Sequence, residues 1–129
     1  MAEKLIRILY VDDEPDIQMV ARLALEMVGG FVLEVCNSGA EALERAASFQ
    51  PQLLLLDVMM PGMDGPTTLR RLRELPQTAA TPAVFMTAKV QTGEIAQYEE
   101  LGAVGVIPKP FDPMALAGQV QKIWEGCHG

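Results

Sequence analysis

Short apolar runs alternate with longer segments of helical periodicity along the whole chain. The apolar runs are rich in aliphatic and β-branched residues, which predicts strands. They are Leu5–Val11, Val32–Cys36, Leu53–Leu56, Ala83–Met86 and Val104–Ile107. Leu53–Leu56 has no polar position, as expected for a central strand covered on both faces. Glu34 interrupts the second run, as an edge strand permits.

Each predicted strand is followed by a segment whose apolar residues recur at helical spacing. The first segment begins near Pro15, which suits a first helical turn, and ends near the Gly29–Gly30 pair. Its expected apolar face consists of Ile17, Val20, Ala21, Ala24 and Val28. The later faces are Leu43, Ala46 and Ala47; Leu69 and Leu72; Ile95, Tyr98 and Leu101; and Leu116, Val120, Ile123 and Trp124. Five successive βα units predict an α/β fold, a doubly wound five-stranded parallel sheet with right-handed crossovers.

Composition narrows the class of protein. A chain of 129 residues, half of them apolar and 21% charged, fits one folded domain, here expected to span residues 1–129 with a core at about 5–125. Ten Lys and Arg against seventeen Asp and Glu give a net charge of −7, so we expect no direct binding of nucleic acid. No apolar run approaches the roughly 20 residues that span a bilayer. We therefore expect a cytoplasmic protein without membrane contact, in which Cys36 and Cys127 are free thiols.

Polar side chains follow four of the five predicted strands. They are Asp12, Asp13 and Glu14 after the first strand, Asp57 after the third, Thr87 after the fourth and Lys109 after the fifth. In open α/β sheets, ligands bind beyond the carboxyl ends of the strands, near the point where strand order reverses. The sequence therefore predicts that these side chains meet at one edge of the sheet.

Each of these residues also has an ordinary structural explanation. The acidic run before Pro15 could cap a helix, and Asp57 could form a turn. Thr87 could satisfy backbone groups at a strand end, and Lys109 could be a solvated charge. However, carboxylates at the ends of neighbouring strands would repel one another unless a hard cation such as Mg²⁺ lay among them. With Lys109 and Thr87 beside them, the arrangement favours phosphoryl transfer to a carboxylate.

Four segments, in this order and spacing, resemble the receiver domain of two-component response regulators. They are Tyr10–Pro15, Leu56–Gly65, Met86–Ala88 and Lys109–Phe111. The resemblance covers roughly residues 5 to 125 and is specific as a combination. It implies a flavodoxin-like three-layer sandwich with strand order 2-1-3-4-5.

The resemblance also implies roles for individual residues. Asp57 would be the phosphoacceptor, taking its phosphoryl group from a sensor histidine kinase or a histidine phosphotransfer protein. Asp13 and Asp57 would bind Mg²⁺, or Mn²⁺, directly together with the backbone carbonyl of Met59, while Asp12 would act mainly through water.

The remaining roles concern the phosphoryl group. Lys109, on an expected cis peptide bond to Pro110, would pair with it. Thr87 and the backbone N–H of Ala88 would donate hydrogen bonds to its oxygens. Movement of Thr87 and of the segment after it would then change the face formed by the fourth helix, fifth strand and fifth helix.

The chain departs from the family pattern at several positions. Val106 stands where an aromatic residue commonly turns inward, and Pro108 directly precedes Lys109. Met59 and Lys89 flank the opening, where family members control access of the attacking water. The acidic residues Glu94, Glu99 and Glu100 do not favour the charge-paired dimer of DNA-binding members. We expect a monomer, with a weak dimer as the alternative.

The expected function is that of a stand-alone bacterial receiver that signals to a downstream protein and carries no DNA-binding output domain. A receiver cut from a longer regulator is the close alternative. We expect no enzymatic activity beyond Mg²⁺-dependent self-phosphorylation and autodephosphorylation. A haloacid-dehalogenase-type phosphatase would need Asp-x-Asp, but the chain has Asp57-Val58-Met59. A flavodoxin-like electron carrier would need a phosphate loop after the first strand, where the chain has carboxylates.

Overall fold

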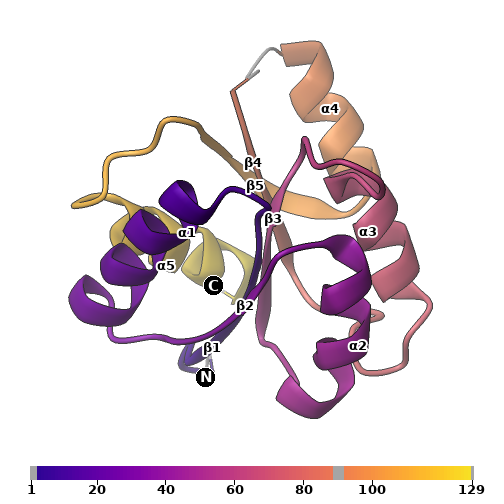
Figure 1. Cartoon of the computed structure of the whole chain (residues 1–129), viewed down its shortest axis with the longest axis horizontal. Helices are drawn as coiled ribbons and strands as arrows, with labels where there is room; N and C mark the ends of the chain where they lie inside the picture. The colour runs from indigo at the N-terminus through magenta and orange to yellow at the C-terminus, as the bar shows by residue number, and fades with distance from the viewer. Residues whose placement is uncertain (1–2, 89–91, 129) are drawn as a thin grey trace.

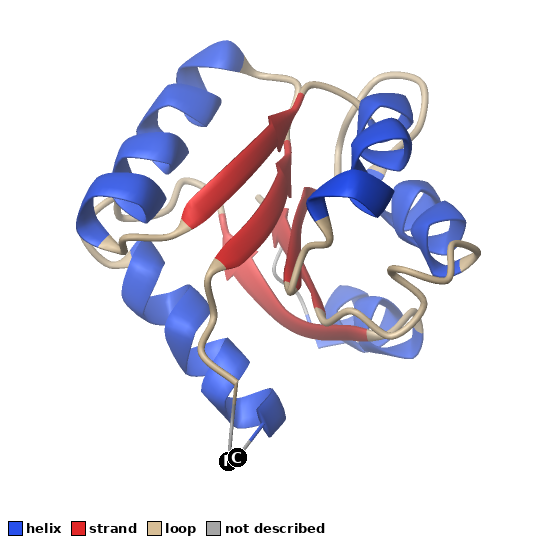
Figure 2. Ribbon diagram, turned by 90° about the horizontal axis from the view of Figure 1, so that it is seen from below, coloured by secondary structure: helices blue, strands red, loops and turns tan. Residues whose placement is uncertain are grey.

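The computed structural model describes residues 3–88 and 92–128, which include one five-stranded parallel sheet. Its strands are β1 Arg7–Val11, β2 Val32–Cys36, β3 Leu53–Asp57, β4 Ala83–Thr87 and β5 Ala103–Pro108. Their order across the sheet is β2-β1-β3-β4-β5. Figure 2 shows the sheet in red with helices on both of its faces. The predicted doubly wound sheet and its 2-1-3-4-5 order are therefore confirmed.

Helices cover both faces of the sheet, giving three layers (Figure 1). They are α1 Pro15–Arg22, η1 Leu23–Val28, α2 Gly39–Phe49, α3 Gly65–Arg73, α4 Thr92–Glu100 and α5 Leu116–His128. α1, η1 and α5 pack on one face, and α2, α3 and α4 pack on the other. The candidate site residues lie at or just after the carboxyl ends of the strands. Because the strands are parallel, these ends share one edge of the sheet.

The alternation of side chains along each strand divides the core into two layers. In β1, Ile8 and Tyr10 face the α1/α5 layer, whereas Leu9 and Val11 face the α2/α3 layer. Leu53–Leu56 of β3 are fully buried, as predicted for a central strand. Each buried leucine contributes about 1.5–3 kcal/mol of transfer free energy, so β3 is a firm support for the residue at its end.

The first helix differs from its predicted periodicity. After α1 the chain continues as the π-helical segment η1, and the N–H of Gly29 donates to the carbonyl of Ala24 at 3.2 Å. A π turn holds more residues than an α turn, so later side chains rotate away from the 3.6-residue repeat. Leu25 is fully buried while Val28 is 52% exposed. The prediction that Val28 shares the buried face was wrong, as it was for Val20, which is 37% exposed.

Candidate metal centre at the carboxyl edge of the sheet

The predicted site residues converge where the parallel strands end. Asp12 follows β1 directly and Asp57 is the last residue of β3, the neighbouring strand. One carboxylate oxygen from each of Asp12, Asp13, Glu14 and Asp57 lies within 4.8 Å of the others. The sequence placed Glu14 after the strand but assigned it no role in binding the metal. The structure adds it to the acidic cluster.

Asp12 is fully buried, and hydrogen bonds hold both of its carboxylate oxygens. Oδ1 accepts from the backbone N–H of Glu14 at 3.0 Å. Oδ2 accepts from the Tyr10 hydroxyl at 2.8 Å and lies 3.5 Å from Lys109 Nζ. Burial, reinforced by the Asp12 charge, raises the pKa of Tyr10 above its usual value, so this phenol remains a hydrogen-bond donor.

Asp13 and Asp57 differ from Asp12 because each has a carboxylate oxygen without a partner. Asp13 Oδ1 and Asp57 Oδ2 are buried, and neither has a hydrogen-bond partner among the described residues. A buried carboxylate oxygen left without a partner is costly. A hard divalent cation, which binds oxygen ligands, would satisfy both atoms. The residues present therefore fit a divalent metal ion.

Lys109 supplies the positive charge in this cluster. Its Nζ lies 3.3 Å from Asp57 Oδ1 and 3.6 Å from Glu14 Oε1, and its side chain is only 14% exposed. Burial alone would lower the pKa of Lys109, but Asp12, Asp57 and Glu14 outweigh burial and raise it. The ammonium group therefore stays charged at neutral pH.

The Asp57 carboxyl has a raised pKa. Burial and then the Asp12 charge raise its pKa to about 6, although Lys109 opposes the shift. The cluster of four carboxylates thus has one neighbouring ammonium group, which contacts three of them, and it keeps a negative excess. A divalent cation would remove that excess, which is the same conclusion that the unpartnered oxygens support.

The ordinary structural explanations do not account for the acidic run. Glu14 is the N-cap residue of α1, but its side chain makes no capping hydrogen bond. Asp57 is the last residue of β3 and is not part of a turn. Pro15 does occupy the first helical turn, as predicted.

The other predicted residues lie at the same edge. Thr87 ends β4, is almost fully buried, and its carbonyl accepts from the N–H of Lys109 at 2.9 Å. The peptide bond from Lys109 to Pro110 is cis, as predicted. The exposed Ala88 follows Thr87 directly. Met59, two residues beyond Asp57, is 72% exposed, and the predicted flanking residue Lys89 lies outside the described residues.

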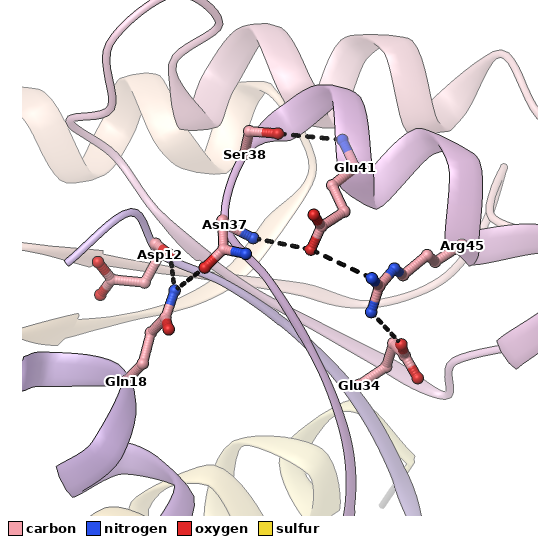
Figure 3. Close-up of polar contacts among 7 residues, drawn as sticks. All are labelled: Asp12, Gln18, Glu34, Asn37, Ser38, Glu41 and Arg45. Carbon is pink, nitrogen blue, oxygen red and sulfur yellow. Dashed lines mark hydrogen bonds and ion pairs between the residues drawn. The ribbon is translucent and has the colours of Figure 1, made fainter. Parts of the chain in front are cut away.

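Two residues near Asp12 had no predicted role. Besides Tyr10, the structure shows Gln18 of α1, whose Nε2 donates to the Asp12 carbonyl and, at 2.8 Å, to Asn37 Oδ1 (Figure 3). The two-residue separation of Tyr10 and Asp12, which places both on one face of a strand, was the available signal for Tyr10. No comparable pattern marks Gln18, because its partners come from different loops.

An apolar pocket of about 370 Å³ opens beside this cluster. Ile17 and Val20 of α1 line one side, which explains why Val20 is not buried in the core. Ala88, Lys109, Pro110 and Phe111 complete the lining. The pocket thus shares Lys109 with the acidic cluster.

Comparison with known proteins gives a consistent result. Residues 8–121 match the family described as the response regulator receiver domain. The transcriptional activator protein IrlR of Burkholderia pseudomallei is 39% identical over 118 residues, covering 92% of this chain and 50% of that protein. The response regulator PleD of Caulobacter vibrioides is 39% identical over 119 residues, covering 91% of this chain and 26% of that protein. The chain thus spans half or less of the length of these two curated relatives.

Solved structures agree in fold. The chemotaxis protein CheY4 of Vibrio cholerae superposes with a TM-score of 0.86 at 28% identity, covering 93% of this chain and 99% of that one. A response regulator of Chloroflexus aurantiacus gives 0.83 at 32% identity, covering 95% and 99%. Within the part of the chain that the structure describes, no helix is both long and apolar enough to cross a membrane.

Proposed function

The chain belongs to the response regulator receiver domain family, and from this premise we propose that Asp57 is its phosphoacceptor. The observation that carries the proposal is the set of contacts around Asp57: Lys109 lies at 3.3 Å from one carboxylate oxygen, and the other oxygen is buried without a partner among the described residues. This is the arrangement needed for a carboxylate nucleophile beside a cation and an ammonium group.

Asp13 and Asp57 would hold a Mg²⁺ or Mn²⁺ ion through their unpartnered oxygens, with the Met59 carbonyl as a further ligand. Asp12 would contribute through water, because both of its oxygens already accept hydrogen bonds. When bound, the ion would supply positive charge for the oxygens of the transferred phosphoryl group. This assignment of direct and indirect ligands rests on the difference in hydrogen bonding between Asp12 and its neighbours.

The transfer itself uses residues of this chain. A carboxylate oxygen of Asp57 forms a bond to phosphorus while the bond from phosphorus to the donor's imidazole nitrogen breaks, and the imidazole leaves with its electron pair. Lys109 balances the charge on the phosphoryl oxygens, and Thr87 and the Ala88 N–H donate hydrogen bonds to them. The burial of Asp57 and Lys109 strengthens these interactions by excluding water.

The proposed phosphodonor is a histidine kinase or histidine phosphotransfer protein. Because the apolar pocket formed by Ile17, Val20 and the Pro110–Phe111 segment shares Lys109 with the cluster, a donor seated there would hold its imidazole close to Asp57. The output would be a contact with a downstream protein. We propose that this receiver acts in the cytoplasm. The two curated relatives, IrlR and PleD, are at least twice as long as the region of each that matches this chain.

The proposal is tested by incubating the protein with acetyl phosphate and Mg²⁺ and measuring its intact mass. We expect one added phosphoryl group, which is lost in Asp57→Asn and in excess EDTA. Glu44→Gln, an exposed carboxylate on α2, is the matched control and should still be modified. An adduct that persists in Asp57→Asn would contradict the assignment. Steady release of phosphate without an adduct would instead favour a phosphatase.

A further inference from the structure

Tyr10 lies below the metal centre with its ring in the core and its hydroxyl at the acidic cluster. The side chain is fully buried and packs in the layer that faces α1 and α5. A buried tyrosine hydroxyl usually has a hydrogen-bond partner. Here the partner is a carboxylate of the site itself, Asp12 Oδ2, at 2.8 Å.

The position of this hydrogen bond follows from the strand. Successive side chains of β1 alternate between the faces of the sheet, so a residue two positions beyond Tyr10 lies on the same face. Asp12 follows the strand directly, which brings its carboxylate within reach of the phenol. A phenylalanine would fill nearly the same volume in the core but could not donate to Asp12.

The hydrogen bonding around the cluster separates Asp12 from the other two aspartates. Asp12 Oδ2 contacts the Tyr10 hydroxyl and Lys109, and Asp12 Oδ1 accepts from a backbone N–H. Asp13 and Asp57 each keep one buried oxygen with no partner among the described residues. The Tyr10 hydroxyl is therefore part of what turns Asp12 toward Lys109 and leaves the other two carboxylates available.

We propose that Tyr10 is a positioning residue for the metal centre: its hydroxyl holds the Asp12 carboxylate beside Lys109, so that Asp12 orients water while Asp13 and Asp57 bind the cation directly. This rests on the proposed function, because it requires the cluster to bind a divalent ion. Groups that orient the residues around a metal commonly change its affinity by about 10- to 100-fold.

The test is Mg²⁺ affinity, measured by amide chemical-shift titration of the unphosphorylated protein. In Tyr10→Phe the affinity should fall about tenfold. Ile8→Val is the matched control, because Ile8 is buried in the same layer of the same strand and makes no polar contact with the cluster. It should lower stability slightly and leave Mg²⁺ affinity within about twofold of the unaltered protein.

A double-mutant cycle distinguishes positioning of Asp12 from a general effect on the fold. In an Asp12→Ala background, Tyr10→Phe should cause no further loss of affinity. An equal loss in both backgrounds would overturn the inference, as would an unchanged affinity in Tyr10→Phe alone. If the unaltered protein binds no Mg²⁺, the proposed metal centre is wrong and the role of Tyr10 is wrong with it. If the unaltered protein binds Mg²⁺ and Tyr10→Phe binds it equally well, only the role of Tyr10 is refuted.

Discussion

At the scale of single residues, the site concentrates negative charge, which destabilises the folded protein when no cation is bound. Four carboxylates lie together, three of them contact the Lys109 ammonium group, and burial raises the pKa of Asp57 to about 6. Functional sites commonly keep such unfavourable groups, and replacing them often stabilises the fold while removing activity. The orphaned oxygen of Asp13 is the clearest example among the described side chains.

Asp13→Asn should therefore raise the free energy of unfolding by about 1 kcal/mol in the absence of divalent cations. The substitution removes one negative charge from the cluster without changing the size of the side chain. Saturating Mg²⁺ should reverse the order, because the unaltered protein gains stability by binding the ion and the variant does not. Urea denaturation in EDTA and in Mg²⁺ measures both effects.

The matched control is Asp16→Asn. Asp16 lies in the first turn of α1, where a carboxylate favours the helix dipole, and it is outside the acidic cluster. This substitution should lower the free energy of unfolding by about 0.3–1 kcal/mol. If Asp13→Asn also lowered the free energy of unfolding in EDTA, repulsion within the acidic cluster would not be what destabilises the metal-free protein.

The contrast among these residues also shows what a sequence can reveal. Asp12, Asp57 and Lys109 could be assigned to one site because the chain order of strand ends determines which side chains meet. The spacing of Tyr10 and Asp12 places both on one face of the strand, but it does not specify the hydrogen bond between them, which depends on where the two side chains point. Residue identity and spacing thus predict which groups meet, and packing decides which atoms are left unpaired.

At the scale of elements, the apolar runs predicted every strand to within two residues at each end, and the π-helical backbone of η1 was missed. Val32–Cys36 agrees at both ends, and β3 and β4 each extend one residue farther, to Asp57 and Thr87. The first strand begins at Arg7 rather than Leu5. The π-helical η1 was not predictable, because an apolar pattern does not specify whether a turn contains an extra residue.

The loops after β1 and β2 are tied together by the polar chain drawn in Figure 3. Its inner end is Gln18, which donates to the Asp12 carbonyl and to Asn37. Its outer end is Arg45, which lies 2.6 Å from Glu34 and 3.7 Å from Glu41. The Gln18 end should contribute more to the free energy of unfolding than the Arg45 end. Arg45 is nearly half exposed, whereas the hydrogen bond from Gln18 to the Asp12 carbonyl is partly buried.

Gln18→Ala should accordingly lower the free energy of unfolding by about 1 kcal/mol, the usual net value of an intramolecular hydrogen bond. Arg45→Ala should lower it by less than about 0.5 kcal/mol, because exposed ion pairs are screened and cost side-chain entropy. Chemical denaturation of both variants under the same salt conditions makes the comparison. A larger loss for Arg45→Ala would contradict this ranking, and equal losses would show that partial burial gives the Gln18 contact no advantage over the exposed ion pairs.

At the scale of the whole molecule, α4 and α5 differ in how firmly they are anchored to the sheet. α5 contributes four buried residues to its layer, Leu116, Ala117, Val120 and Trp124. Of the described side chains of α4, Tyr98 alone is buried, and its ring packs against Phe85 with centroids 5.0 Å apart. Elements with few buried contacts are the ones that move most easily between alternative states.

This difference predicts that α4 is the helix that moves in the proposed switch. Closure of Thr87 on the phosphoryl group would pull on the segment that leads to α4, the weakly anchored helix. Val106 in β5 is half-buried against the same layer and has no ring to turn inward, so the response should depend on Thr87. A ligand can shift the conformation only through such differential contacts with the two states.

We therefore expect the phosphorylated protein, or its beryllium fluoride complex, to change amide hydrogen exchange in Thr92–Glu100 and Ala103–Pro108. Exchange in α2, which packs on the far side of the same layer, serves as the internal control and should stay constant. Thr87→Ala should still accept the phosphoryl group on Asp57 but lose most of the change in exchange, because the hydroxyl is the contact that couples the two regions. If the change in α4 persists in Thr87→Ala, the signal leaves the site by another route, and the pull on α4 through Thr87 is not the switch.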